Sequence, residues 1–137
     1  MAAELFTLPI RIEPADIDEL GHVNNIVYLR WAQEMAIAHW RARASAEMIA
    51  AYVWVVRRHE VDYHAPLQLG DDAVARTWVD AEPHGAQWRR FVEIGKAGAA
   101  RPCVSISSNW VLLDAQTRRV KRVAPDIVAR FLVQNAG

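Results

Sequence analysis

The chain has 137 residues, a hydrophobic fraction of 53%, and 16 basic against 16 acidic side chains. This length and composition predict one domain over residues 1–137, and the balanced charge gives no reason to expect nucleic acid or an anionic membrane as a partner. No apolar run approaches the roughly 20 residues that span a bilayer. Met1–Glu4 lacks a basic region followed by a long apolar stretch, so we expect no signal peptide. The single cysteine, Cys103, cannot form an internal disulfide, so we expect a cytoplasmic protein.

The first predicted element is a strand over residues 6–13, where apolar side chains alternate with others. Pro9 has no N–H to donate to a neighbouring strand, so this strand should lie at the edge of a sheet or contain a bulge. Pro14 ends the strand and leads into a polar loop over residues 16–25.

That loop concentrates residues that are able to do chemistry, and it opens onto the longest apolar run in the chain. It contains Asp16, Asp18, Gly21, His22, Asn24 and Asn25. An asparagine is a good helix N-cap, and a carboxylate at a helix start lies beside free backbone N–H groups and the positive end of the helix dipole. Such groups activate water and hold an oxyanion.

A long helix is predicted from about Asn24 to Arg43. Its apolar residues recur at spacings of three and four, and together they form a face so wide that only a narrow polar stripe remains. The stripe consists of Arg30, Gln33, Glu34, Arg41 and Arg43. A helix that is apolar nearly all round is expected to be surrounded by protein. A short helical piece follows near residues 44–51.

Four strands are predicted after it, over residues 53–67, 73–81, 87–94 and 103–113, with turns between them and a short C-terminal helix from Pro125. In the third of these strands one parity holds Trp88, Arg90, Val92 and Ile94, and the other holds Arg89, Phe91 and Glu93. The short connections suit antiparallel neighbours. The simplest arrangement is an α+β fold in which one curved, five-stranded antiparallel sheet wraps around the long central helix.

The loop and the first helical turns read Asp16-x-Asp18-x-x-Gly21-His22-Val23-Asn24-Asn25-x-x-Tyr28-Leu29. This pattern resembles the signature of hotdog-fold acyl-CoA thioesterases in the 4-hydroxybenzoyl-CoA thioesterase family. The stretches 61–71 and 109–114 are similar to that family's second strand and turn and to its last strand. The resemblance implies a hotdog fold that hydrolyses a thioester of coenzyme A or acyl carrier protein, with no cofactor beyond the coenzyme A of the substrate.

The resemblance also implies site residues. The family's catalytic carboxylate falls on Asp18, and its oxyanion donor, a backbone N–H, falls near Asn25. Plant acyl-carrier-protein thioesterases have a histidine that His22 matches, although Leu20 stands where those enzymes have an asparagine. Whether Asp18 acts as general base or as nucleophile stays open. Asp16 is expected either to shape the loop or to be a solvent-exposed charge.

Substrate contacts are predicted in two groups. From the loop and helix come Gly21, Asn24, Tyr28 and Trp31, of which Tyr28 and Trp31 are also expected in the core. For the nucleotide we expect Arg89 and Arg90, because residues 82–85, where the resemblance places basic side chains, are poor in them. The histidines lack metal-ligand spacing, so no metal site is predicted, and Cys103 is expected in the core.

A homodimer or a homotetramer is expected, since a single sheet leaves edge strands that invite pairing, and the resemblance implies a site between two protomers. Two alternatives stay open. One is a non-enzymatic module that binds acyl-CoA, and the other is a hotdog hydratase or dehydratase. Release of free thiol from acyl-CoA substrates distinguishes a thioesterase from both.

Overall fold

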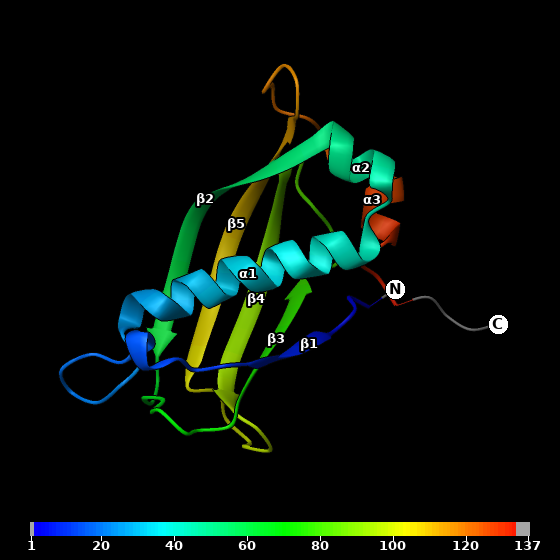
Figure 1. The fold of residues 1–137 in the computed structure, drawn as a ribbon. Coiled ribbons are helices and arrows are strands. Elements are labelled where there is room, and N and C mark those ends of the chain that lie inside the picture. Colours follow the sequence, from blue (N-terminus) through cyan, green and yellow to red (C-terminus); the bar gives the residue numbers. More distant parts are fainter. Residues whose placement is uncertain (1, 134–137) are drawn as a thin grey trace.

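The computed structural model describes residues 2–133, in which a long helix crosses one face of an antiparallel sheet (Figure 1). The strands are β1 (Phe6–Ile10), β2 (Tyr52–Tyr63), β3 (Ala73–Val79), β4 (Gln87–Lys96) and β5 (Val104–Asp114). The helices are α1 (Asn25–Arg43), α2 (Ala46–Ala51) and α3 (Pro125–Ala129), and a 3-10 turn, η1, spans Pro14–Asp16. The five strands lie in the order β1-β3-β4-β5-β2, and every neighbouring pair is antiparallel. The predicted five-stranded sheet with one long central helix is confirmed.

The two edge strands differ in how they are protected. β1 is short, and Pro9 lies in it opposite Val74, so the prediction of an edge position is confirmed. It ends at Ile10 rather than near residue 13 because its partner β3 begins at Ala73. β2, at the other edge, is 12 residues long and contains no proline. Its register against β5 shifts between Val56 and Arg58, which gives the bend that its length predicted.

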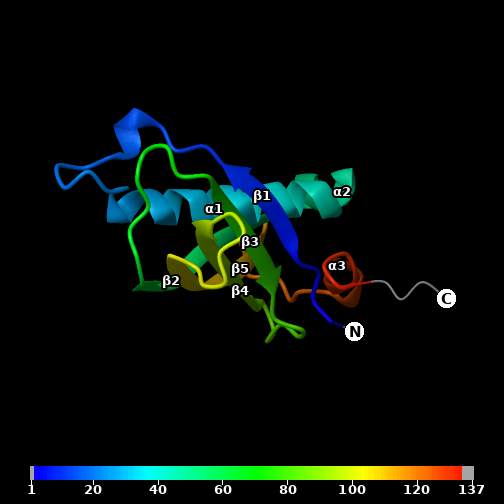
Figure 2. The same cartoon turned by 90° about the horizontal axis from the view of Figure 1, so that it is seen from below.

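Helix α1 meets the sheet with one face only (Figure 2). Its buried residues are Tyr28, Trp31, Ala32, Met35, Ala36 and His39. On the other side Ile26 is 74% and Ile37 is 46% exposed. The expectation that α1 is surrounded by protein is therefore wrong for a single chain, because the sheet does not close around the helix.

The core between helix and sheet consists of two apolar clusters separated by polar side chains. The first includes Trp31, Met35, Ala75, Val92 and Ile106, together with Cys103 as predicted. The second includes Val79, Trp88, Leu112, Ile127 and Phe131. Alternate residues of a strand share a face, so the residues between the two clusters face α1 as well. They are Thr77 on β3, Arg90 on β4 and Ser108 on β5, and all are buried.

A buried hydrogen-bonded chain ties α1 to these polar positions. Arg90 Nη1 donates to His39 Nδ1 and to Thr77 Oγ1, each at 2.9 Å. Because an arginine only donates, His39 Nε2 carries the proton and donates to Glu4 Oε1 at 2.9 Å. Burial and the charge of Arg90 lower the pKa of His39 to about 4, and burial lowers the pKa of Arg90 to about 10. At neutral pH, His39 is therefore uncharged and Arg90 is charged.

This arrangement predicts acid lability. The pKa of His39 falls from 6.5 to about 4 on folding, so between these values the unfolded chain binds a proton that the folded chain excludes. The free energy of unfolding should decrease by up to about 3 kcal/mol as the pH falls through that window. Urea unfolding at several pH values between 4 and 7 measures it. The His39→Gln variant should show a clearly weaker pH dependence; an unchanged dependence would assign the effect to other groups.

Candidate active site

The polar loop is a tight turn from Asp18 to His22. The Asp18 N–H donates to the His22 carbonyl at 2.8 Å, and the Gly21 N–H donates to the Asp18 carbonyl at 3.0 Å. Gly21 has φ +77°, a left-handed conformation that favours glycine. Asp18 Oδ1 accepts from the Leu20 N–H at 2.9 Å, whereas Oδ2 accepts no hydrogen bond from residues 2–133. The loop thus holds one carboxylate oxygen and leaves the other available.

Asp16 has the opposite character, because both of its carboxylate oxygens are engaged. It is 3% exposed. Its Oδ1 accepts from Arg30 Nη2 at 2.8 Å, and its Oδ2 accepts from the Glu13 N–H at 2.9 Å. The hydrogen bond and the charge of Asp16 raise the pKa of Arg30. Asp16 is therefore a loop-forming residue that ties the loop to α1, and the alternative of a solvent-exposed charge is wrong.

The start of α1 leaves one backbone donor free. The N–H of Asn24 donates to the Asp16 carbonyl at 2.8 Å, and Asn24 Oδ1 caps the helix by accepting from the Ile26 N–H at 3.0 Å. The Val27 N–H donates to the Asn24 carbonyl. In the part of the chain that the structure describes, the Asn25 N–H has no acceptor, and it stands at the positive end of the helix. The Asn25 carbonyl accepts from Tyr63 Oη at 3.0 Å, which anchors the end of β2 to this point.

The other predicted residues near the loop occupy varied environments. His22 is half-buried, and its ring makes no hydrogen bond with the described residues. Gly21 is exposed, with open space where a Cβ would stand, so only its backbone conformation requires glycine. Tyr28 and Trp31 are each 2% exposed, as expected for core residues. Contact of these four residues and of Asn24 with the substrate stays a prediction.

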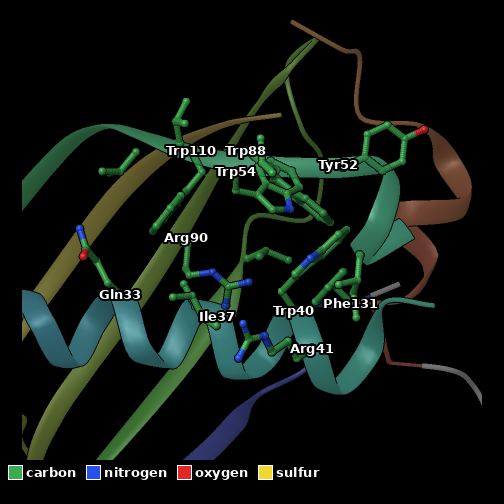
Figure 3. A pocket seen from close by; sticks show the side chains of 16 residues that line it. Gln33, Ile37, Trp40, Arg41, Tyr52, Trp54, Trp88, Arg90, Trp110 and Phe131 are labelled. Atoms are coloured by element: carbon green, nitrogen blue, oxygen red, sulfur yellow. The ribbon is translucent and has the colours of Figure 1, made fainter. Parts of the chain in front are cut away.

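A groove of about 650 Å³ opens between the C-terminal half of α1 and the first half of β2 (Figure 3). Aromatic side chains dominate its lining: Trp40, Tyr52, Trp54, Trp88, Trp110 and Phe131. Ile37 of α1 lines it and lies 12 residues beyond Asn25, which corresponds to about 18 Å along the helix axis. Within one chain, the groove and the Asp18 loop therefore lie at different ends of α1.

Arg89 and Arg90 lie on opposite faces of β4, as neighbours in a strand must. Arg89 is exposed, whereas Arg90 is 7% exposed, faces α1 and lines the groove. A nucleotide in solvent can reach Arg89. Arg90, in contrast, lies within reach of a ligand in the groove.

Sequence reasoning missed the groove and the buried chain of His39, Arg90 and Glu4. Two signals were present. His39 follows Met35 by four residues on the apolar face of the helix, and Arg90 alternates in phase with Trp88 and Val92. A charged residue in phase with apolar ones indicates a buried charge.

Within residues 2–133, no helix is long and apolar enough to cross a membrane. Over the same residues, no three His, Cys, Asp or Glu side chains gather into a group able to hold a metal ion.

A five-stranded antiparallel sheet packed along one long central helix is the architecture of the hotdog fold. The chain belongs to the Thioesterase-like superfamily, which matches residues 12–131. Among solved structures it is similar to a thioesterase from Thermus thermophilus complexed with coenzyme A and Zn. Identity is 25%, the TM-score is 0.78, and the match covers 91% of this chain and 90% of that one.

Two more distant structures share the fold. A protein from Staphylococcus aureus, solved in complex with CoA, is 16% identical with a TM-score of 0.79 and covers 95% of this chain and 83% of that one. A 1,4-dihydroxy-2-naphthoyl-CoA thioesterase from Synechocystis is also 16% identical, with a TM-score of 0.75 and coverage of 88% and 90%. Comparison with the curated proteins gives no match.

The two aspartates of the loop should differ in their effect on stability. Asp16→Asn removes a charge that accepts two hydrogen bonds in a buried position, so it should lower the free energy of unfolding by about 1–2 kcal/mol. Asp18→Asn should cost less than about 1 kcal/mol, because only one of its oxygens is bonded. Urea unfolding of both variants at pH 7 measures this difference. Equal losses would contradict the structural role given to Asp16.

Proposed function

We propose that this protein hydrolyses an acyl thioester of coenzyme A or acyl carrier protein to a free acid and a thiol. One observation carries the proposal: within residues 2–133, Asp18 Oδ2 accepts no hydrogen bond and the Asn25 backbone N–H has no acceptor, and both groups lie beside the turn that precedes α1. The ion pair of Asp16 with Arg30 holds that turn in place. Membership of the superfamily supports the reaction class, as does the likeness to a thioesterase solved with coenzyme A.

The chemistry needs a group to activate the attack and a donor for the developing negative charge. The thioester carbonyl oxygen would accept a hydrogen bond from the Asn25 N–H, which strengthens as that oxygen becomes an oxyanion. Asp18 Oδ2 would either take a proton from an attacking water or attack the carbonyl carbon to form a mixed anhydride that water then hydrolyses. The His22 ring lies in the same turn, and we assign it a supporting hydrogen bond to the substrate. Collapse of the tetrahedral intermediate expels the thiolate.

The unprotected β2 edge supports a dimer. A long edge strand without proline presents unpaired N–H and C=O groups, which a second copy of the same strand can satisfy in antiparallel fashion. Along β2 the basic pair Arg57 and Arg58 precedes the acidic residues Glu60 and Asp62. Antiparallel pairing of two copies therefore brings opposite charges toward each other.

Such a dimer also joins the two separated parts of the site. The Tyr63 end of β2 is anchored to Asn25 beside the Asp18 loop, whereas the Tyr52 end lines the groove. Antiparallel pairing sets the Tyr63 end of one copy beside the Tyr52 end of the other. The loop of each chain would then face the groove of its partner, and a substrate would span the two chains.

The role of Asp18 predicts a specific kinetic loss. Asp18→Asn keeps the shape of the side chain and removes its charge, so single-turnover hydrolysis should slow by roughly 10²- to 10⁴-fold. Asp16→Asn is the matched control and should stay within about tenfold of the wild type, or roughly 1.4 kcal/mol in barrier. If Asp18→Asn hydrolysed at the wild-type rate while Asp16→Asn was inactive, the catalytic carboxylate would be Asp16 and not Asp18.

The shared site predicts complementation between two inactive variants. One variant is Asp18→Asn; the other is Ile37→Glu, which places a charge in the groove from an exposed helix position. A mixed dimer has one site with both defects and one intact site, so random mixing should restore about a quarter of the wild-type activity. Refolding the two variants together, with thiol release as readout, measures this. A mixture as inactive as its components would place the loop and the groove of each site in the same chain.

A further inference from the structure

We propose that the groove binds an acyl group that carries a carboxylate at its far end, and that Arg90 is the specificity-determining residue that holds this carboxylate. The substrate class is then the mono-thioester of a dicarboxylic acid. This inference rests on the proposed thioesterase function and assigns its acyl group.

The first support is the charge of the groove. Its lining contains two arginines, Arg41 and Arg90, and no acidic residue. Arg41 is exposed on α1 and stands at the rim, whereas Arg90 lies deeper, between the sheet and Ile37 (Figure 3). A groove with aromatic walls and two guanidinium groups is complementary to an apolar chain that ends in an anion.

The second support is that Arg90 lacks the partner that a buried charge normally has. Within residues 2–133 it forms no ion pair with any carboxylate. Glu4 is engaged instead with His39 and with Arg43, whose Nε lies 2.7 Å from Glu4 Oε1. The two hydrogen bonds of the guanidinium, to His39 and Thr77, both use Nη1. Nε and Nη2 therefore remain as donors. Because buried charges in proteins are almost always paired, we expect a ligand anion to use these donors.

The third support comes from a neighbouring donor. Trp110 also lines the groove, and its Nε1 is a buried N–H with no acceptor in the described chain. An indole N–H only donates, so it requires an acceptor oxygen. A carboxylate has two acceptor oxygens and suits the planar fork of an arginine, whereas a saturated alkyl end satisfies neither residue.

The fixed position of Arg90 should also set the preferred length of the acyl chain. The carboxylate must reach the guanidinium while the thioester lies at the Asp18 loop, so one chain length should be preferred over shorter and longer ones. Adipoyl-, suberoyl- and sebacoyl-CoA test this, each against the monocarboxylic thioester of the same length: hexanoyl-, octanoyl- and decanoyl-CoA.

The experiment compares kcat/KM within each pair of equal length. The wild type should prefer the dicarboxylic member of the best pair by about 10- to 100-fold, the scale of a hydrogen bond to a charged group. Arg90→Gln should abolish the preference, and Arg90→Lys should retain part of it. Arg89→Gln, a change on the other face of β4, should affect both members of a pair alike. Because the readout is a ratio within one variant, a lower folded fraction does not affect it, and melting curves record folding separately.

Binding to the Asp18→Asn variant separates this inference from the proposed hydrolysis. Quenching of the groove tryptophans by suberoyl-CoA and octanoyl-CoA, with and without Arg90→Gln, gives affinities that do not depend on turnover. Arg90-dependent preference for suberoyl-CoA without hydrolysis by the wild type would support this inference and overturn the proposed function. Hydrolysis of both thioesters with no Arg90-dependent preference would support the function and overturn the inference. The absence of both hydrolysis and preferential binding would overturn the inference and the proposed function together.

Discussion

The position of α1 on the sheet is the constraint on which both parts of the site depend. At its start the helix is fixed by the Asn24 cap and by the ion pair of Arg30 with Asp16, which also fixes the Asp18 loop. In its second half it is fixed by His39, whose imidazole links Arg90 on the sheet to Glu4 near the N-terminus. The first attachment leaves Asp18 Oδ2 and the Asn25 backbone N–H without a hydrogen-bond partner in residues 2–133. The second keeps a charged guanidinium buried in the wall of an aromatic groove.

The Asp18 loop and the groove are too far apart in a single chain to form one site. The sheet covers one face of α1, the groove lies about three helical turns from the loop, and the long edge of β2 has no partner within the described chain. One operation, antiparallel pairing of two β2 edges, would satisfy the unpaired strand and bring loop and groove together. The same proposed dimer would therefore serve both the unpaired strand and the proposed reaction.

The architecture was predictable because its signals are local and periodic. Alternation gave the strands, helical spacing gave α1, and Pro9 correctly indicated an edge strand. The opposite roles of Asp16 and Asp18 were harder to predict, since only three-dimensional contacts show that Arg30 and the Glu13 N–H engage both oxygens of Asp16. The groove could not be predicted because its lining joins α1 and β2 to side chains distant along the chain, such as Trp88, Trp110 and Phe131, although Arg90 was already in phase with apolar neighbours. The expectation that α1 is surrounded failed because periodicity reports how apolar a helix is and not which chain covers it.

Thioester hydrolysis at the turn before α1 is the proposed activity on which the other proposals depend. Its most direct test is the release of free thiol by the purified wild-type protein from a panel of short, long, aromatic and carboxylate-bearing acyl-CoA thioesters. We expect catalytic turnover, with one free acid and one coenzyme A produced per thioester consumed. Stoichiometric binding of these thioesters without release of thiol would contradict it and would favour a module that binds acyl-CoA. Addition or removal of water within the acyl chain, with the thioester left intact, would instead favour a hydratase.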